Sequence, residues 1–380
     1  MSGNVLIAMD SFKGSITGNE AGRIIAECFE TCLPAIRISR ILLADGGEGS
    51  LAALEAVTDD MMTFSVDSYD PAGDPVVSLI GYCDRRREAF IEIAQTDALP
   101  MVDVKKRNLL EMSSSGVGIL VKKALDLGAE KINLFLGGSA TVDAGAGMLQ
   151  ELGAVFLSDG HKLEYRGSAR TVMEADAADF SSLDPRISSV EFVGYCDVSN
   201  PLAGPEGAAL VFGPQKGGTE DMLKLLDRKM VSFAGLYPGA DLSLAGGGSA
   251  GGLGFAVASA LGGRLASGSE YFLGIQDIDR KLDGAELVIT GEGRIDRQTL
   301  DGKGPGMIAR LASQKCVPVI GICGSYESDF DVRNSCFTSV FSILHGCCTP
   351  DTAMTPETAT ANLRSFSENL ASLLSAVKKL

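Results

Sequence analysis

The sequence predicts a two-domain α/β protein built around a parallel β-sheet, and three observations carry this prediction. A short apolar run, a glycine-rich polar turn and an amphipathic helix follow one another several times along the chain, as expected of strand–turn–helix units in a parallel sheet. The chain has 380 residues, enough for two domains at roughly 100 to 200 residues each. Two stretches, 62–93 and 154–276, interrupt the pattern and indicate a second domain.

Each repeat of the unit is predicted from its own residues. Five runs rich in apolar side chains are typical of strands covered on both faces; they span residues 5–9, 38–44, 131–136, 286–290 and 317–323. The first helix is predicted to begin at Thr17, because Thr17 and Glu20 form a capping box, and Pro34 marks its end. Further helices are expected over residues 50–57, 116–127 and from about residue 356 onward.

The two interrupting stretches have a different pattern. Residues 62–93 predict a β-hairpin with its turn at 70–74, where proline, glycine and aspartate gather. Within 154–276 we expect strands at 190–195 and 208–212 and a helix near 221–236. The first domain is therefore predicted to comprise residues 1–61, 94–153 and 277–380, and the inserted mixed α/β domain to comprise residues 62–93 and 154–276.

Charge and hydropathy exclude two classes of partner. Lysine and arginine total 33 against 49 acidic residues, so the net charge is −16, which is unfavourable for nucleic-acid binding. No apolar run approaches 18 residues, so no membrane span is expected. The N-terminus lacks the basic segment of a signal peptide. The expected partners are small molecules, and the oligomeric state stays open.

The nine cysteines predict reduced thiols. They lie mostly in apolar runs and include no Cys-x-x-Cys pair, and the chain has only two histidines, His161 and His345. A structural zinc site is therefore not favoured. Reduced, buried cysteines are typical of a cytoplasmic protein.

Polar residues cluster just after the predicted strands, where open parallel sheets bind their ligands. Alone, each has an ordinary explanation as a helix cap, a turn former or a surface lysine. Together, acidic, glycine-rich and lysine-containing turns suit a phosphate ester with a divalent metal, because backbone N–H groups bind phosphate oxygens and carboxylates hold Mg²⁺. The residues are Asp10, Ser11, Lys13, Asp45, Glu48, Ser139, Thr141, Asp143, Glu292, Arg294 and Asp296.

Other catalytic motifs are weak or missing. Residues 246–254 fit Gly-x-Gly-x-x-Gly, but no clear strand precedes them, so a phosphate or substrate loop before a helix at 255–261 is favoured over a dinucleotide site. The Walker pattern is absent, so ATP would not be held by a standard P-loop. Without a Gly-x-Ser-x-Gly elbow, a hydrolase is not favoured, and a general base is expected to be a carboxylate.

At residues 10–15 (Asp-Ser-Phe-Lys-Gly-Ser) and 44–49 (Ala-Asp-Gly-Gly-Glu-Gly) the sequence resembles the bacterial glycerate kinase family, the type I glycerate 2-kinases. Similar blocks follow in the family's order at 137–145, 196–202, 212–217, 247–254 and 290–296. The resemblance covers nearly the whole chain and implies a flavodoxin-like or Rossmann-like domain, dependence on ATP and Mg²⁺, and phosphorylation of glycerate to 2-phosphoglycerate. It departs at Met9, where the family has proline, and near residues 95–99 and 113–118.

The resemblance and the residue chemistry together give a hypothesis for each position. Lys13 contacts the substrate carboxylate or the transferring phosphoryl group, and Arg294 binds the glycerate carboxylate. Asp197 and Asp296 supply the Mg²⁺ ligand and the general base, in an order that is left open. Substrate contacts are also expected from Asp10, Ser11, Asp45 and Glu48. The proposed phosphate-binding residues are Gly137, Gly138, Ser139, Thr141, Asp143, Gly248, Ser249 and Gly251.

Three alternatives remain at this point. The phosphoryl group could go to the 3-hydroxyl instead of the 2-hydroxyl, or the protein could bind a sugar acid or hydroxy acid without catalysis. A hydroxy-acid dehydrogenase is a further alternative, which the weak Gly-x-Gly-x-x-Gly context disfavours.

Overall fold

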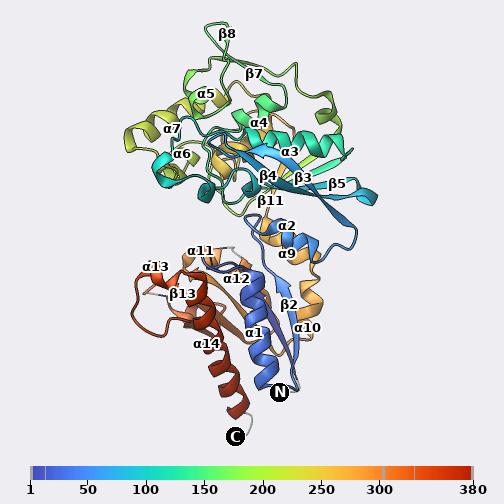
Figure 1. Cartoon of the computed structure of the whole chain (residues 1–380), viewed down its shortest axis with the longest axis vertical. Coiled ribbons are helices and arrows are strands. Elements are labelled where there is room, and N and C mark those ends of the chain that lie inside the picture. Colours follow the sequence, from blue (N-terminus) through green and yellow to red (C-terminus); the bar gives the residue numbers. More distant parts are fainter. Residues whose placement is uncertain (1–2, 13, 302–303, 329, 378–380) are drawn as a thin grey trace. The chain divides into compact units, whose positions relative to one another are not determined.

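The computed structural model describes residues 3–12, 14–301, 304–328 and 330–377. The chain divides into two compact units (Figure 1): unit 1 combines Met1–Ala44 with Ser269–Leu380, and unit 2 is the continuous segment Asp45–Gly268. This division differs from the predicted one, since residues 45–61 and 94–153 belong to unit 2 and not to the discontinuous domain.

Unit 1 is built on a five-stranded parallel sheet. Its strands, in sheet order, are β14 (Ser339–Ser342), β13 (Val319–Tyr326), β12 (Leu287–Ile295), β1 (Asn4–Met9) and β2 (Arg37–Leu42). Counted along the chain within this unit, the order is 2-1-3-4-5, which is the flavodoxin-like arrangement. The predicted α/β class and the flavodoxin-like layer implied by the resemblance are confirmed.

Helices cover both faces of this sheet because its central strands are apolar on both faces. Val5 and Ile7 of β1 pack into one cluster with α1 (Gly18–Cys32) and α14 (Pro356–Val377), which lie side by side in Figure 1. Leu6 points to the opposite face of the sheet. It packs there in a second cluster with α9 (Gly268–Ile275), α10 (Ile278–Asp283) and α12 (Gly304–Gln314). The short helices α11 (Arg297–Asp301) and α13 (Pro350–Ala353) complete the unit.

The predicted start of α1 is confirmed by its cap. The Glu20 backbone N–H donates to Thr17 Oγ1 at 3.2 Å, which satisfies one of the amides that a helix start leaves free. In the last helix, α14, Leu363 and Leu370 are in the core, but Leu373 is 58% exposed.

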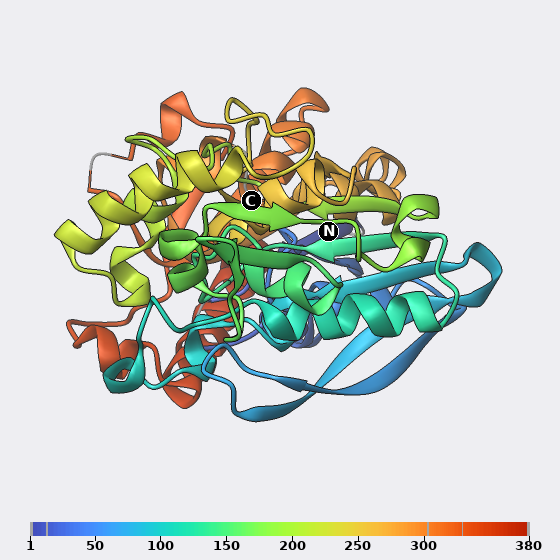
Figure 2. The same ribbon diagram turned by 90° about the horizontal axis from the view of Figure 1, so that it is seen from above.

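Unit 2 has a six-stranded mixed sheet. The strands β11 (Arg264–Ala266), β10 (Glu191–Tyr195), β6 (Lys131–Phe135) and β5 (Glu88–Glu92) are parallel, and the hairpin β4 (Pro75–Cys83) and β3 (Met61–Tyr69) extends the sheet antiparallel to β5. Figure 2 shows this hairpin along one edge. Because β5 and β6 pair directly, residues 62–93 and 94–153 share one sheet, which explains why the predicted boundary between them does not occur.

Around this sheet lie seven helices among the described residues of unit 2, together with a small antiparallel sheet. The helices are α2 (Ser50–Glu55), α3 (Ser115–Asp126), α4 (Ala146–Glu151), α5 (Ala169–Glu174), α6 (Ala208–Phe212), α7 (Glu220–Ala234) and α8 (Leu253–Ser259). The small sheet contains β7 (Val155–Ser158), β8 (His161–Lys162) and β9 (Ala177–Asp179). No helix among the described residues is both long and apolar enough to span a bilayer.

Two segments differ from their predicted type. Residues 208–212 form the helix α6 and not a strand; a five-residue apolar run fits either structure by pattern alone, and Ala208 and Ala209 favour helix. Residues 291–295 follow the predicted strand 286–290 as its expected turn but continue β12, because Arg294 and Ile295 pair with Ser325 and Tyr326 of β13.

Candidate active site

The carboxyl ends of β1 and β12 meet at the centre of the unit 1 sheet. Met9 lies opposite Gly291 in the parallel register, and the Asp10 N–H continues the pairing by donating to the Gly291 carbonyl at 2.8 Å. From β1 the chain continues to β2 on one side, while the later strands lie on the other. Such a switch point is where open α/β sheets bind ligands.

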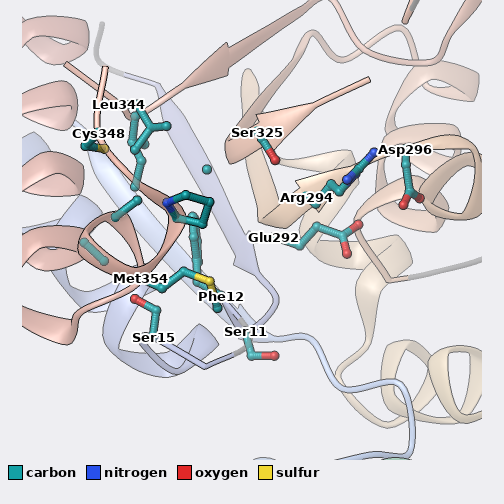
Figure 3. Close-up of a pocket in the computed structure, with 16 residues that line it drawn as sticks. Ser11, Phe12, Ser15, Glu292, Arg294, Asp296, Ser325, Leu344, Cys348 and Met354 are labelled. Carbon is teal, nitrogen blue, oxygen red and sulfur yellow. The ribbon is translucent and has the colours of Figure 1, made fainter. Parts of the chain in front are cut away.

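A pocket of about 430 Å³ lies at this switch point, and every lining residue belongs to unit 1. Figure 3 shows its two sides: Glu292, Arg294 and Asp296 on one, and Phe12, Leu344, Cys348 and Met354 on the other. The polar side comes from β12 and the residue after it, and most of the apolar side comes from residues 343–359. The pocket therefore combines a charged half with an apolar half.

The carboxylates of the polar side are held by one threonine. The Thr299 hydroxyl donates to Glu292 Oε1 at 2.7 Å and accepts from the Asp296 N–H at 3.1 Å. In return, Asp296 Oδ1 accepts from the Thr299 N–H at 3.2 Å, at the start of α11. Asp296 thus has a fixed position and one oxygen directed to a helix start, and its second oxygen accepts no hydrogen bond from the described residues.

Arg294 is the cation of this pocket. Its side chain is exposed, and within the described part of the chain it forms no ion pair. A guanidinium that is not neutralised by the protein suits a carboxylate or phosphate ligand, which it can bind through two parallel hydrogen bonds.

The first predicted turn lies beside these residues. Ser11 lines the pocket, and its N–H donates to Asp10 Oδ1 at 2.6 Å, which fixes the buried Asp10 carboxylate at the strand end. Lys13, predicted to contact the substrate, lies outside the described residues.

In unit 2, the turn at 45–49 packs on the carboxyl ends of that unit's parallel strands. The Gly137 N–H donates to the Gly46 carbonyl at 2.8 Å, and a Cβ on Gly137 would lie 2.4 Å from Gly47 Cα. Glycine is required where these two loops meet. The Asp45 carboxylate accepts from the Gly47 N–H at 2.9 Å, and Glu48 is exposed.

Glu92, at the end of β5, was not identified from the sequence. Its carboxylate accepts hydrogen bonds from the Gly49 and Leu51 N–H groups at 3.0 and 2.9 Å. Glu92 therefore provides acceptors for backbone N–H groups at the start of α2. Burial raises the pKa of Glu92. The segment that carries Asp45 and Glu48 is therefore anchored to the sheet by a buried acid.

Most of the predicted phosphate loop at 137–143 is buried inside unit 2. Lys216 Nζ donates to Ser139 Oγ at 2.8 Å and to the Thr141 carbonyl at 2.7 Å. The Thr141 hydroxyl donates to Asp97 Oδ2 at 2.7 Å. Burial raises the pKa of Asp97 to about 7 and lowers that of Lys216 to about 8, and the attraction between these charges, together with Asp143 for Lys216, opposes both shifts.

Asp143 has a structural set of partners. Its carboxylate accepts from the Ser114 N–H and hydroxyl at 2.9 and 2.7 Å and from the Gly145 and Gly147 N–H groups at 3.0 and 3.2 Å. It is fully buried, and burial raises its pKa. These contacts bind the start of α3 to the start of α4. Of the predicted loop, Gly138 is exposed.

The glycine-rich segment at 246–254 packs against this same loop. Gly251 has φ +64°, and a Cβ there would lie 1.9 Å from the Thr141 carbonyl oxygen. Gly248 is equally crowded by the Pro201 carbonyl, at 2.3 Å, and Ser249 is 2% exposed. Close packing accounts for these glycines, and their role in nucleotide binding stays a prediction.

Asp197 follows β10 and belongs to unit 2, whereas Asp296 belongs to unit 1. Asp197 is exposed, and its Oδ1 accepts from the Ser267 hydroxyl at 2.7 Å. Ser267 follows β11, the parallel neighbour of β10, so both side chains come from adjacent strand ends.

Carboxylates that suit Mg²⁺ are present, although no cluster of three or more His, Cys, Asp or Glu side chains suited to a metal occurs among the described residues. Protein-bound Mg²⁺ commonly uses only one or two carboxylates, with water and substrate phosphates as the other ligands. Glu292 and Asp296, which line one pocket, meet that requirement.

Besides Glu92, sequence reasoning missed three features of these sites. Asp97 and Lys216 carry no motif of their own, and only their burial together identifies them. The apolar wall formed by Leu344 and Met354 lies in a region without a predicted strand or motif. Lys216 was within one of the blocks noted at 212–217, which was the only available signal.

A flavodoxin-like unit with a half-charged pocket at its switch point is typical of an α/β protein that binds a small molecule. Comparison with known proteins is more specific. The sequence pattern of the Glycerate kinase family matches residues 5–375, so the chain belongs to the glycerate kinase family and is a kinase.

Individual relatives agree over nearly full length. The chain is 40% identical over 348 residues to a glycerate kinase from Bacillus subtilis, covering 90% of each chain. It is 36% identical over 376 residues to a glycerate 2-kinase from Escherichia coli, covering 97% of each. A crystal structure from Salmonella typhimurium LT2, assigned to glycerate kinase 2, matches with a TM-score of 0.80 at 38% identity and covers 100% of both chains.

Proposed function

We propose that this protein transfers the γ-phosphoryl group of ATP to the 2-hydroxyl of glycerate, giving 2-phosphoglycerate and ADP. Family membership and the name of the Escherichia coli relative support the reaction and its regiochemistry. The observation in the structure that carries the proposal is the charged half of the unit 1 pocket, where Arg294 has no ion pair within the described residues and lies with two carboxylates.

The reaction needs a base, an anion-binding group and charge neutralisation. The glycerate hydroxyl oxygen forms a bond to the γ-phosphorus, the bond from that phosphorus to the bridging oxygen of ADP breaks, and the hydroxyl proton leaves to a base. We assign the base to Asp296, because Thr299 fixes its position and leaves an oxygen available. We assign the glycerate carboxylate or a phosphate to Arg294.

Mg²⁺, when bound with the nucleotide, would neutralise charge on the phosphate oxygens. We propose Glu292 and Asp296, which line one pocket of unit 1, as the carboxylates that would hold it; a metal role for Asp197 of unit 2 is a separate proposal. A metal role and a base role for Asp296 have different consequences, since the loss of a metal ligand raises the Mg²⁺ requirement and the loss of a base lowers turnover at every Mg²⁺ concentration.

The other predicted substrate and phosphate contacts also remain proposals. Asp10, Ser11, Asp45 and Glu48 stay proposed substrate contacts. Gly137 and Gly138 keep a proposed phosphate role because their backbone is at least partly accessible. The other assignments, Lys13 among them, also remain proposals, and so does a cytoplasmic location, which the free state of all nine cysteines supports.

Phosphorus NMR of the product mixture tests the proposal directly. Purified protein with glycerate, ATP and Mg²⁺ is expected to produce ADP and 2-phosphoglycerate in equal amounts. A 3-phosphoglycerate signal would contradict the regiochemistry. Binding of glycerate without any loss of ATP would contradict the enzyme itself and favour a non-catalytic binding protein.

A further inference from the structure

We infer that the apolar half of the unit 1 pocket binds the nucleoside end of the phosphoryl donor, an adenine ribonucleoside in the case of ATP. The donor's identity rests on the proposed function. The inference concerns which substrate occupies the wall formed by residues 343–359, a segment to which no ligand has been assigned above.

The size of the pocket is the first argument. Its volume is about 430 Å³, within the roughly 300–1,000 Å³ typical of sites for ligands of drug size. A three-carbon acid fills only a small part of such a space. A nucleoside with its phosphates has the dimensions that this volume fits.

The chemistry of the wall is the second argument. Glycerate has an oxygen on every carbon and therefore gains little from apolar surroundings, whereas a purine ring has two broad faces that exclude water. A thioether and an aromatic ring are both favourable partners for such a face. The apolar lining consists of Phe12, Ile343, Leu344, Pro350, Met354 and neighbouring small residues.

The order of polarity is the third argument. Arg294 and Ser325 lie toward one side of the pocket, and Leu344 and Met354 lie on the other (Figure 3). A nucleoside triphosphate has the same order, with an apolar ring at one end and anionic phosphates at the other. The phosphates would lie by Arg294 and the base by the apolar wall.

Two side chains of the apolar wall are still partly exposed to water and would be covered by a bound ring. Met354 is 46% exposed and Leu344 is 37% exposed, although both line the pocket. Covering such side chains with a ring removes apolar area from water and favours binding.

Alkylation of Cys348 tests the inference without relying on catalysis. Cys348 lines the pocket, while Cys316 is exposed in the same unit outside the pocket lining. The whole protein is treated with N-ethylmaleimide, and each cysteine is followed by peptide mass spectrometry. With enough ADP to occupy about nine-tenths of the sites, Cys348 is expected to react roughly tenfold more slowly, with Cys316 unchanged. Protection of Cys348 by glycerate but not by ADP would overturn the inference.

Leu344→Ala gives a second, kinetic test. This variant is expected to raise the KM for ATP roughly tenfold and to leave the KM for glycerate unchanged. Leu373→Ala is the matched control, because Leu373 is exposed and outside the pocket lining. A raised KM for glycerate with an unchanged KM for ATP would show that the wall binds the acceptor.

The two proposals fail in different ways. If the wild-type protein phosphorylates glycerate but Leu344→Ala leaves the KM for ATP unchanged, the nucleoside site is wrong and the proposed function stands. If ADP protects Cys348 but glycerate is never phosphorylated, the nucleoside site stands and the acceptor is wrong.

Discussion

In both units, acidic and glycine-rich segments follow the parallel strands, but the surroundings of these segments differ between the units. In unit 1, Arg294 is exposed in a pocket. In unit 2, Asp97, Asp143 and Lys216 are buried and hydrogen-bonded to neighbouring loops. The same kind of sequence thus places an exposed arginine in the unit 1 pocket and a buried polar network in unit 2, although Glu48 and Asp197 of unit 2 are exposed. Each predicted residue has to be judged by its own accessibility.

The largest expected effect is on catalysis in the unit 1 pocket. Asp296→Asn should lower kcat by about 10²- to 10⁴-fold if the carboxylate is the base, while the helix start stays capped because asparagine caps as well as aspartate. Steady-state kinetics over a range of Mg²⁺ measures it. Asp331→Asn is the matched control, since Asp331 also caps a short helix through the Arg333 N–H and lies outside the pocket lining. Unchanged kcat in the Asp296 variant would remove it from the reaction.

The largest expected effect on stability is in the buried network. Lys216→Met removes the bonds to Ser139 and Thr141 and leaves Asp97 without its compensating cation. Each buried polar group left without its partner typically costs about 1–3 kcal/mol, and urea unfolding measures the loss. Lys224→Met is the control, because that lysine is exposed and its loss should not change the unfolding midpoint. An equally small effect at Lys216 would mean that the network contributes little.

A smaller effect is expected where two loops of unit 2 touch. Gly251→Ala must both adopt a positive φ and move away from the Thr141 carbonyl, and the steric part should cost about 1–3 kcal/mol. Gly262→Ala measures the cost of the positive φ alone, because Gly262 has φ +65° but nothing within 4 Å of an added Cβ. The difference between the two variants in urea unfolding gives the contact alone; equal losses would show that backbone strain explains both.

The last prediction concerns how the free energy of unfolding changes with pH. Folding raises the pKa of Asp97 from 3.8 to about 7, so between these values the folded state keeps a proton that the unfolded state loses, and stability falls as pH rises. Folding lowers the pKa of Lys216 from 10.5 to about 8, so stability rises with pH over that window. One proton gives a slope of at most about 1.4 kcal/mol per pH unit.

Comparison with the double variant Asp97→Asn/Lys216→Met isolates this dependence. The wild-type minus variant difference in the free energy of unfolding should decline from pH 4 to 7 and recover above pH 8. A flat difference would show that neither group titrates with a shifted pKa.

Local patterns were sufficient for most of the fold. The strands near residues 5–9 and 131–136 and the cap at Thr17 depend on neighbours in sequence, and the structure places them as predicted. The accessible residues Ser11 and Arg294 could also be predicted, because the ends of parallel strands meet at one edge.

The rest depended on contacts between distant residues. Asp97 and Lys216 both hydrogen-bond to Thr141. Because the three residues are far apart in the sequence, no local pattern predicts that they meet. The strand at 291–295 exists because β13 is long enough to pair with it. The predicted division into domains differs from the two units for the same reason, since the parallel strands of both sheets produce the same strand–turn–helix pattern.

The interrupted connectivity of unit 1 has a consequence for synthesis. β1 lies between β2 and β12, and β12 begins only at Leu287. At about 5–20 residues per second, the first two strands leave the ribosome roughly 10 to 50 s before their central partner is made. Unit 2, being continuous, can fold during that interval. The N-terminal strands therefore wait for β12 before the centre of the unit 1 sheet can form.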